Sequence, residues 1–351
     1  MSPLRVIEID TGREWRGGQD QVRLLARELT RGGAVDLELV TCRGGELGRR
    51  ARADGVTVHE VPWSLSYDPR ALVGLVRRIR AFEPTMLHAH DSHALQLAAW
   101  ARRLTRARGV RLCATRRVDF HVRAGSVWFQ ADRIVAISGA VRDVLVSDGI
   151  APDRVVVVPS GIDPAEVRSA AARPLGIRER LGAPAAAPLA VNVAALVPHK
   201  DQRTLIHAAA IARTACPDLR WVIAGAGELR HSLAALIRRL ELEDRVYLLG
   251  YVPNADALIR EANVLVMSSR EEGLGSVVLH AMALGRPVVA TRGGGLPEIV
   301  PAEWLVPVGD ANLLAQQVVA ALSRAPQSML PPQFTAAEMA RGVLALYQSL
   351  A

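Results

Sequence analysis

Residues 268–300 read SSREEGLGSVVLHAMALGRPVVATRGGGLPEIV, and this stretch decides the fold. It opens at the end of an apolar strand, VLVMSS, and continues through an acidic pair, Glu271 and Glu272. A short apolar helix closed by Gly285 follows, then a second strand, PVVAT, and three glycines. Apolar runs of this length, separated by a helix and glycine turns, predict the strand-turn-helix-strand unit of an open parallel sheet.

Glu272 is predicted at the carboxyl end of the first of these strands. Ligands bind at that edge of open parallel sheets. The backbone N–H groups of Leu274, Gly275 and Ser276 start the following helix, where free amides and the helix dipole favour an anion. A carboxylate beside such a turn also accepts hydrogen bonds from hydroxyl groups. The stretch therefore predicts a site for a molecule with anionic and hydroxyl groups, such as a sugar phosphate.

The segment EGLGSVVLHAMALGRPVVAT resembles the signature of the retaining glycosyltransferases of family 4, which use sugar nucleotides and have the GT-B fold. That signature has a second glutamate eight positions after the first, and His280 stands in its place. The positions that match the signature are Gly273, Gly275, Ala281, Met282, Ala283, Gly285, Pro287, Val288 and Val289.

The resemblance implies an α/β chain of GT-B fold, with two Rossmann-like, doubly wound domains that face each other across a cleft. Residues 1–165 would bind the acceptor, and a terminal helix at 335–351 would pack back on them. Residues 185–330 would bind the nucleotide sugar. The resemblance also implies retention of configuration, with no metal or other cofactor. We therefore expect a hexosyl- or heptosyltransferase that acts on a glycan or lipid-linked acceptor in cell-surface polysaccharide or lipopolysaccharide assembly.

Length and composition set broad limits. A chain of 351 residues with 50% hydrophobic residues can form about two domains, since domains commonly hold ~100–200 residues. We expect it in the cytoplasm, because no apolar run reaches the roughly 18 residues of a spanning helix and the first residues predict a strand. Three scattered cysteines indicate neither a disulfide framework nor a zinc site. Aromatic residues make up only 4% and no recognition motif is present, so nucleic acid is not an expected partner.

The net charge of +8 is concentrated in the first half of the chain. Two runs of arginines, at 77–80 and 102–108, contribute to it. Such runs attract phosphates and anionic lipid headgroups, so peripheral binding to the inner face of a membrane is one expectation. A solvated helix face in an arginine-rich chain is an equally weighted alternative.

Short apolar strands alternate with helices in both halves, which predicts two doubly wound α/β domains. In the first half, a strand at 5–10 is followed by a loop and a helix from Gln21 to about Arg31. Residues 17–18, Gly-Gly, would lie just before this helix, where bare backbone can approach a ligand. Residues 164–188 are rich in alanine, proline and arginine, with one short helical piece at 175–182, and we interpret them as the linker and entry to the second domain.

Lys200 is the only lysine among 43 basic residues. A chain that uses arginine everywhere else has a reason to keep a compact ammonium at this place. The surrounding segment resembles the family's donor loop, whose arginine and lysine hold the donor diphosphate. Lys200 matches the lysine, and Ala195 stands at the arginine position. Arg270 or Arg292 could supply the missing charge, and an exposed loop lysine is the structural alternative.

Two side chains within residues 268–300 are expected to contact the donor. Glu272 should bond hydroxyls of the donor sugar, and helix capping is its structural alternative. His280 lies close to a helix start, which disfavours a charged imidazole. We expect a neutral His280 that bonds a ribose hydroxyl, with an ordinary core histidine as an equally weighted alternative.

Glycine-rich turns complete the predicted donor site. Gly294 and Gly295 would bring amides near the phosphates, ahead of a helix that Glu298 starts. The loop at 225–228 resembles the family's loop near the nucleobase. Lys200 and Glu272 are the expected catalytic residues. The expected donor-binding residues are Gly17, Gly18, Lys200, Gly227, Glu272, Gly273, Leu274, Gly275, Ser276, His280, Gly294 and Gly295.

Residues 88–93, HAHDSH, contain side chains that commonly bind metal ions. Metallo-hydrolases use His-x-His-x-Asp-His, but here the aspartate directly follows the second histidine, so the spacing argues against a metal. His88 and His90 would share one strand face at its carboxyl end, on the acceptor side. Arg116 and Arg117 end the next strand, where many relatives carry a histidine near the reacting centre, and they complete the acceptor-side set.

The resemblance implies that the donor diphosphate leaves an oxocarbenium-like sugar and that the acceptor hydroxyl attacks from the same face. Electrostatic placement would supply most of the rate. Ala195, Arg117 and His280 together also leave open a non-catalytic GT-B-like protein that binds a nucleotide or glycan. An NAD-dependent dehydrogenase is a weaker alternative, because no GxGxxG motif follows the first strand.

Overall fold

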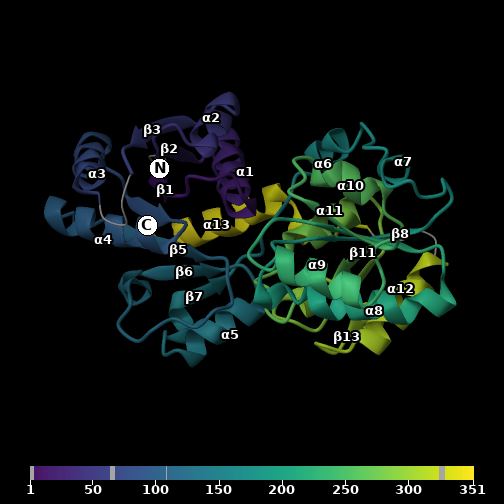
Figure 1. The fold of residues 1–351 in the computed structure, drawn as a ribbon. Helices are drawn as coiled ribbons and strands as arrows, with labels where there is room; N and C mark the ends of the chain where they lie inside the picture. The colour runs from purple at the N-terminus through teal and green to yellow at the C-terminus, as the bar shows by residue number, and fades with distance from the viewer. Residues whose placement is uncertain (1–3, 64–67, 108, 324–328) are drawn as a thin grey trace. The chain divides into compact units, whose positions relative to one another are not determined.

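The structure is a computed structural model, and it describes residues 4–63, 68–107, 109–323 and 329–351. Position 108 of the second arginine run and the start of the Pro-rich break at 328 lie outside the described residues. The chain forms two compact units (Figure 1). Unit 1 contains residues 1–162 and 332–351, and unit 2 contains residues 163–331.

Unit 1 is built on a parallel sheet whose described strands run in the order β3-β2-β1-β4-β5-β6-β7. The chain extends from β1 to one edge and then returns to place β4 on the other side of β1. The gap between β1 and β4 is therefore the switch point at which such sheets bind ligands. The strands are β1 (Leu4–Asp10), β2 (Val35–Cys42), β3 (Thr57–Val61), β4 (Met86–Ala89), β5 (Arg111–Arg116), β6 (Arg133–Ala136) and β7 (Val155–Val157).

Helices cover both faces of this sheet, as the alternating pattern predicts. The first helix begins at Gly17 rather than at Gln21, so the Gly17–Gly18 pair forms its first turn instead of preceding it. The helices of unit 1 are α1 (Gly17–Gly32), α2 (Glu46–Ala53), α3 (Pro69–Phe82), α4 (Ser92–Thr105), α5 (Gly139–Ser147) and α13 (Ala336–Leu350), with short 3-10 turns at Val127–Gln130, Pro152–Arg154 and Pro332–Phe334.

The C-terminal helix α13 belongs to unit 1, where it packs against α1 (Figure 1). Val343 and Tyr347 of this helix are buried in the same apolar core as Val22 and Leu25 of α1. Thr335 caps the helix, and the adjacent backbone pairs with Ile162. The last residues of the chain therefore complete the core that its first residues begin.

Unit 2 repeats the plan with a parallel sheet in the order β10-β9-β8-β11-β12-β13 among the described residues. Its switch point lies between β8 and β11. The strands are β8 (Leu189–Val193), β9 (Arg220–Ala224), β10 (Val246–Gly250), β11 (Val264–Met267), β12 (Val288–Thr291) and β13 (Leu305–Val306). The helices are α6 (Pro164–Ala170), α7 (Ile177–Arg180), α8 (Gln202–Ala215), α9 (Arg230–Arg239), α10 (Ala255–Glu261), α11 (Ser276–Ala283) and α12 (Ala311–Leu322), with 3-10 turns at Pro198–Lys200, Leu296–Glu298 and Ala302–Trp304.

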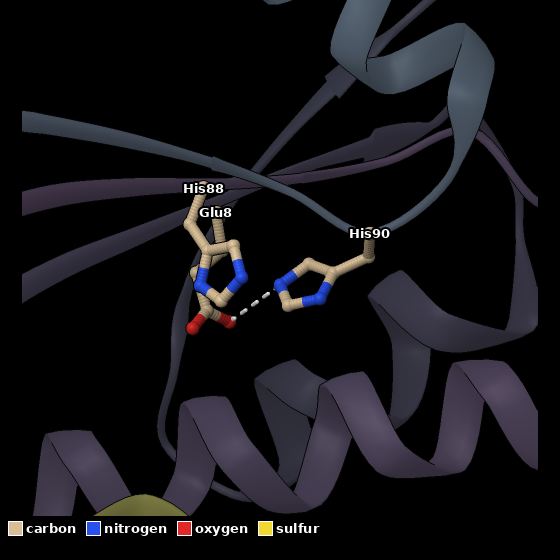
Figure 2. A group of neighbouring side chains, drawn as sticks. All are labelled: Glu8, His88 and His90. Atoms are coloured by element: carbon tan, nitrogen blue, oxygen red, sulfur yellow. Dashed lines mark ion pairs between the residues drawn. The ribbon is translucent and has the colours of Figure 1, made fainter. Parts of the chain in front are cut away.

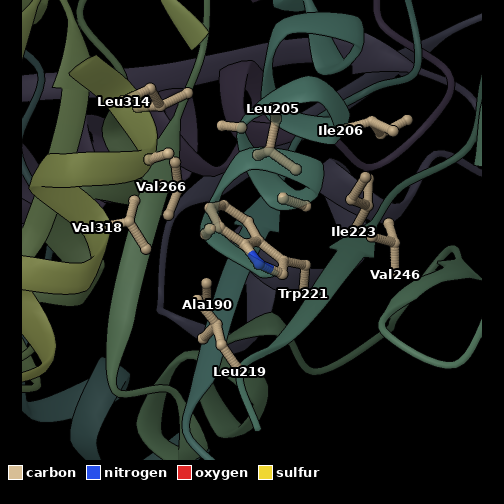
Figure 3. Close-up of a cluster of buried hydrophobic side chains, with 14 of the residues drawn as sticks. Ala190, Leu205, Ile206, Leu219, Trp221, Ile223, Val246, Val266, Leu314 and Val318 are labelled. Atoms are coloured by element: carbon tan, nitrogen blue, oxygen red, sulfur yellow. The ribbon is translucent and has the colours of Figure 1, made fainter. Parts of the chain in front are cut away.

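The core of unit 2 is centred on Trp221 of β9, which is 2% exposed (Figure 3). Its indole ring lies among Leu205 of α8, Val266 of β11 and Val318 of α12. Burying an indole together with aliphatic side chains removes a large apolar area from water. This core supports the strands β8, β9 and β11, whose carboxyl ends carry the candidate site.

Residues 164–188 belong to unit 2 rather than to a linker, and the helix α6 was not expected there. The expected helical piece at 175–182 contains α7. Asp163 caps α6, and Val167 of this helix is buried in unit 2. The carboxylate of Glu261 accepts hydrogen bonds from the N–H groups of Gly176 and Ile177 at 2.9 and 2.8 Å, which fixes the start of α7. The Ala/Pro-rich composition resembles a linker, but these two carboxylates satisfy the backbone groups that would otherwise be exposed.

The two arginine runs lie on α3 and α4 of unit 1. Within them, Arg78 bonds Glu38 at 2.6 Å and Arg102 bonds Asp132 at 2.7 Å, so part of their charge is compensated inside the unit. No described helix combines the length and the apolar character that crossing a bilayer requires.

Candidate active site

Lys200 and Glu272, the two expected catalytic residues, meet at the switch point of the unit 2 sheet. Lys200 ends the 3-10 turn that follows β8, and Glu272 follows β11, the neighbouring strand. The Lys200 Nζ lies 2.6 Å from the Glu272 Oε2, and the two side chains are 16% and 13% exposed. The same carboxylate oxygen accepts a hydrogen bond from the Ser269 hydroxyl at 3.2 Å. Two donors thus hold the carboxylate in one position.

The loops that carry this pair are tied to each other by the backbone. The N–H of Arg270 donates to the carbonyl of His199 at 2.8 Å, and the Ser268 hydroxyl donates to the carbonyl of Lys200 at 2.9 Å. Ser268 is fully buried. Short side chains and main-chain bonds at this edge therefore fix Lys200 relative to the strand that leads to Glu272.

The two arginines suggested as substitutes at the Ala195 position are engaged elsewhere in unit 2. Arg270 pairs with Asp201 at 2.8 Å, and Asp201 in turn caps α8. Arg292 donates to the carbonyl of Ala302 at 3.3 Å. Lys200 pairs with Glu272 at 2.6 Å.

The turn from Gly273 to Ser276 starts α11 as expected. Gly275 is the N-cap, has a φ of 87° and provides no side-chain hydrogen bond to the helix. A side chain there would be strained, because a Cβ would also lie 2.8 Å from Leu296. The N-cap position of α11 is thus Gly275 and not Glu272. The first N–H groups of any helix have no intrahelical acceptor, which leaves this turn suited to an anion.

The glycine run after β12 packs against the loop that carries Glu272. A Cβ on Gly293 would lie 2.3 Å from the carbonyl oxygen of Ser269. The N–H of Gly295 donates to the carbonyl of Glu272 at 2.7 Å, so this amide positions the loop and is not available to a phosphate. Gly294 lies between them with a φ of 52°. Glu298 ends a 3-10 turn and does not start a helix, which corrects the expectation.

Gly225 and Gly227 also allow a close approach of backbone to backbone. A Cβ on Gly225 would lie 1.8 Å from the carbonyl oxygen of Ala194, and a Cβ on Gly227 would lie 2.4 Å from that of Leu196. The loop after β9 therefore presses on the segment that leads from β8 to Lys200. Gly227 has a packing reason to be glycine, and its contact with a nucleobase stays a prediction.

His280 is the fifth residue of α11 and belongs to its last turn, so the argument from the helix start does not apply to it. Its Nδ1 lies 2.6 Å from the Oδ1 of Asp256, on α10. Asp256 orients the ring and was not identified from the sequence. Nothing around Asp256 in the sequence marks it, because the contact depends on how α10 packs on α11.

On unit 1, His88, His90 and Arg117 come together at the switch point between β1 and β4. The two imidazole rings are 4.4 Å apart, centroid to centroid. Arg117 donates to the His90 carbonyl at 3.0 Å and to its Nδ1 at 3.1 Å. A Cβ on Gly18 would lie 3.9 Å from Arg117, so the first turn of α1 is adjacent. Arg116 lies apart from them, over the ring of Trp128 at 4.8 Å.

Glu8 is the central residue of this cluster and was not identified from the sequence (Figure 2). The strand register places Glu8 of β1 opposite His88 of β4. The Tyr347 hydroxyl lies 3.5 Å from Glu8 and 2.5 Å from the Nδ1 of His88, and Thr115 bonds the other His88 nitrogen at 2.7 Å. His90 Nε2 lies 3.6 Å from Glu8.

The four side chains Glu8, His88, His90 and Tyr347 are each no more than 5% exposed by residue, and burial sets their protonation. Burial raises the pKa of Glu8 from 4.5 to about 8, against the opposing charge of Arg117. Burial lowers the pKa of His88 from 6.5 to about 3 and lowers that of His90 as well. The cluster therefore favours neutral side chains at neutral pH.

Glu8, His88 and His90 also lie close enough to hold one cation, since their ligand atoms are within 4.8 Å of one another. Their hydrogen bonds do not fit this role. Both nitrogens of His88 face hydroxyl groups. Arg117 can only donate, so the Nδ1 of His90 accepts and its proton sits on Nε2, the atom that faces Glu8. To bind a cation, the Nε2 of His90 would need a lone pair in place of this proton. The cation would also lie beside the positively charged guanidinium of Arg117.

Both units match known protein families. Residues 187–324 match the family described as glycosyl transferases group 1, and residues 15–166 match glycosyltransferase family 4. The two matched ranges contain the candidate residues of unit 2 and most of those of unit 1.

Curated relatives share parts of the chain. A putative glycosyltransferase of Bacillus subtilis, EpsD, is 36% identical over 123 residues, which are 34% of this chain and 32% of that protein. The putative colanic acid biosynthesis glycosyltransferase WcaL of Escherichia coli is 34% identical over 141 residues, 37% of this chain and 35% of that protein. The chain thus spans about a third of the length of these relatives.

The fold as a whole matches solved structures. The crystal structure of Anabaena HepE in complex with UDP and glucose has a TM-score of 0.80 and 19% sequence identity, over 99% of this chain and 100% of that one. The predicted fold class, two Rossmann-like doubly wound domains, is confirmed.

Proposed function

Because this chain belongs to family 4 of the GT-B glycosyltransferases, we propose that it transfers a sugar from a nucleotide-sugar donor to a glycan or lipid-linked acceptor. One observation carries the proposal: the ion pair of Lys200 and Glu272 at the switch point of the unit 2 sheet. A nucleotide sugar presents a diphosphate and sugar hydroxyls, which match an ammonium and a carboxylate held at such an edge.

Lys200 would neutralise the diphosphate as it leaves. Its ammonium is already oriented by Glu272, so little reorganisation is needed when negative charge develops on the departing oxygen. The first turn of α11, which begins at Ser276, would add backbone amides at the same edge. Glu272, held by Lys200 and Ser269, would accept hydrogen bonds from hydroxyls of the sugar.

The proposal includes retention of configuration and no bound metal. Retention is proposed because residues 268–300 resemble the signature of retaining enzymes. Metal independence is supported by Lys200, which can balance the diphosphate charge, and by the hydrogen bonds at both nitrogens of His88 and at the Nδ1 of His90. The acceptor hydroxyl would attack the face that the leaving diphosphate vacates, and a phosphate oxygen would take its proton.

The identity of the substrates is proposed from the relatives. WcaL is named for colanic acid biosynthesis, and the HepE structure contains UDP and glucose. These names support a uridine diphosphate hexose as donor and cell-surface polysaccharide assembly as the process. The proposal also includes a heptosyl donor as the alternative donor and lipopolysaccharide assembly as the alternative process.

The test is donor turnover by the purified chain with a panel of nucleotide sugars. Release of nucleoside diphosphate is the readout, and Lys200→Ala and Glu272→Gln are the variants. Removing one charge-stabilising donor commonly lowers kcat by about 10²–10³. Arg203→Ala removes an exposed cation from the same part of unit 2 and is the matched control.

The outcomes separate the proposal from its alternative. Turnover that falls by that factor in Lys200→Ala and not in Arg203→Ala supports transfer. Nucleoside diphosphate that raises the melting temperature while no donor in the panel is consumed would instead favour a non-catalytic nucleotide-binding protein. Proton NMR of the anomeric centre in the product checks retention.

A further inference from the structure

The loops that follow β1, β2 and β3 surround a cavity of about 390 Å³ in unit 1. These strands are neighbours in the order β3-β2-β1, so their carboxyl ends meet at one edge of the sheet. The cavity lies on the far side of β1 from His88 and His90, which belong to the β4 side. Its main lining residues are Arg13, Arg43, Gly44, Gly45, Trp63 and Arg70.

Acidic groups compensate the positive charge of this cavity only in part. Arg70 is held by the buried carboxylate of Asp68 at 2.8 Å, which fixes its guanidinium and cancels its charge. Arg13 donates to the main-chain carbonyl of Trp63, a neutral acceptor. Within the part of the chain that the structure describes, neither Arg13 nor Arg43 has a carboxylate within ion-pair distance.

Glu60, an acidic group near Arg43, is engaged as well. Glu60 pairs with Arg52 at 2.7 Å and accepts a hydrogen bond from the N–H of Gly44 at 3.1 Å. The hydrogen bond from Arg52 is the largest cause of its lowered pKa, and the nearby charge of Arg43 contributes as well, so the carboxylate is ionised at neutral pH. Gly45 is the N-cap of α2 and provides no side chain to that helix. Two arginines and a glycine turn therefore face one space, a combination that recognises phosphate.

A second, apolar cavity of about 130 Å³ adjoins the first. Trp63 lines both cavities, and Asp68 lines the second while its partner Arg70 lines the first. Leu72 of α3 and Leu97 and Trp100 of α4 form most of the apolar wall. Trp63 is thus shared by a basic cavity and an apolar one.

We propose that these two adjoining cavities bind an acceptor in which a phosphate or diphosphate group is joined to an apolar group. The anionic group occupies the cavity of Arg13 and Arg43, and the apolar group passes Trp63 into the cavity of Leu72 and Leu97. This assignment rests on the proposed function, since it names the class of acceptor for the same reaction. It also makes a prediction about binding that does not depend on turnover.

Titration calorimetry of the 351-residue chain tests the assignment with three probes: pyrophosphate, farnesyl diphosphate and farnesol. Farnesyl diphosphate should bind about tenfold or more tightly than pyrophosphate, because its chain removes apolar area from water. Arg13→Ala and Arg43→Ala should each weaken both anionic probes by about tenfold or more, as expected for a charge-assisted hydrogen bond. Arg77→Ala, an exposed cation on α3, is the matched control.

Leu72→Trp fills the apolar cavity. It should lower the affinity for farnesyl diphosphate to that for pyrophosphate and leave pyrophosphate binding unchanged. Melting temperatures of all variants close to that of the original chain confirm that each is folded.

Three binding results overturn the assignment: equal affinity in Arg43→Ala and the original chain, equal affinity of farnesol and farnesyl diphosphate, or loss of farnesyl diphosphate binding in Lys200→Ala alone. The last would place the probe at the donor site. Sugar transfer that is independent of Arg13 and Arg43 would sink this assignment and keep the proposed function. If the probes bind as predicted but no donor is consumed, the acceptor cavities are kept and the proposed transferase function is rejected.

Discussion

Replacing Glu8 by glutamine removes the ionisable group of the buried unit 1 cluster and keeps its shape. Glu8 is fully buried, and its pKa is raised from 4.5 to about 8, mainly because burial disfavours the carboxylate. Between these two pH values the folded chain binds more protons than the unfolded chain. The free energy of unfolding therefore falls as the pH rises from about 4.5 towards about 8.

The size of the effect follows from the shift. One pKa unit corresponds to about 1.36 kcal/mol, so the full shift of Glu8 is worth about 4–5 kcal/mol. Ionisation of Glu8 lowers the free energy of unfolding by about 2 kcal/mol of this amount near pH 6 and by nearly all of it near pH 9. Glu8→Gln does not titrate, so the variant should gain about 2–3 kcal/mol relative to the original chain between these two conditions.

Urea unfolding followed by pulsed hydrogen exchange of the β1 peptide measures this difference for unit 1. Glu14→Gln, which removes an exposed carboxylate from the same unit, is the control for a general loss of charge. Stability curves of Glu8→Gln and the original chain that run parallel from pH 6 to pH 9 would refute the reasoning. Such a result would mean that Glu8 titrates in the folded chain as it does in the unfolded one.

Two further changes test the geometry of unit 2. Gly225→Ala should lower the free energy of unfolding of this unit by about 2–4 kcal/mol, because its Cβ would lie 1.8 Å from the carbonyl oxygen of Ala194. Gly182→Ala, with open space around it and a φ of 62°, should cost only about 1 kcal/mol, and equal costs in urea unfolding would contradict the packing argument. Asp256→Asn leaves His280 without its charged partner and should raise the KM for the donor several-fold with little change in kcat. An unchanged KM in steady-state kinetics would remove His280 from the donor site.

The meeting of Lys200 and Glu272 could be predicted from the sequence because each follows a strand that the hydrophobic pattern marks. Strand ends of a parallel sheet share one edge, and local glycine turns identify which loops are open to a ligand. The alternation of strands and helices likewise predicted two doubly wound units. Strand ends, glycine turns and the alternation of strands and helices each depend on a short segment of sequence, which can be interpreted by itself.

The parts that the sequence did not predict depend on contacts between distant segments. Tyr347 reaches Glu8 and His88 from the last helix, across 339 and 259 positions of the chain. Asp256 reaches His280 only because α10 packs on α11. Composition was misleading at the start of the segment at 164–188, where Asp163 caps α6 in a sequence that resembles a linker.

The central claim is that the lone lysine faces the donor diphosphate, and its uniqueness makes a direct measurement possible. Reductive methylation with ¹³C-formaldehyde labels Lys200 and the terminal amine only, so NMR shows one lysine signal. Titration with UDP should shift this signal to saturation, and uridine, which lacks the diphosphate, should leave it in place. A Lys200 signal that stays unchanged while calorimetry shows UDP bound would contradict the account.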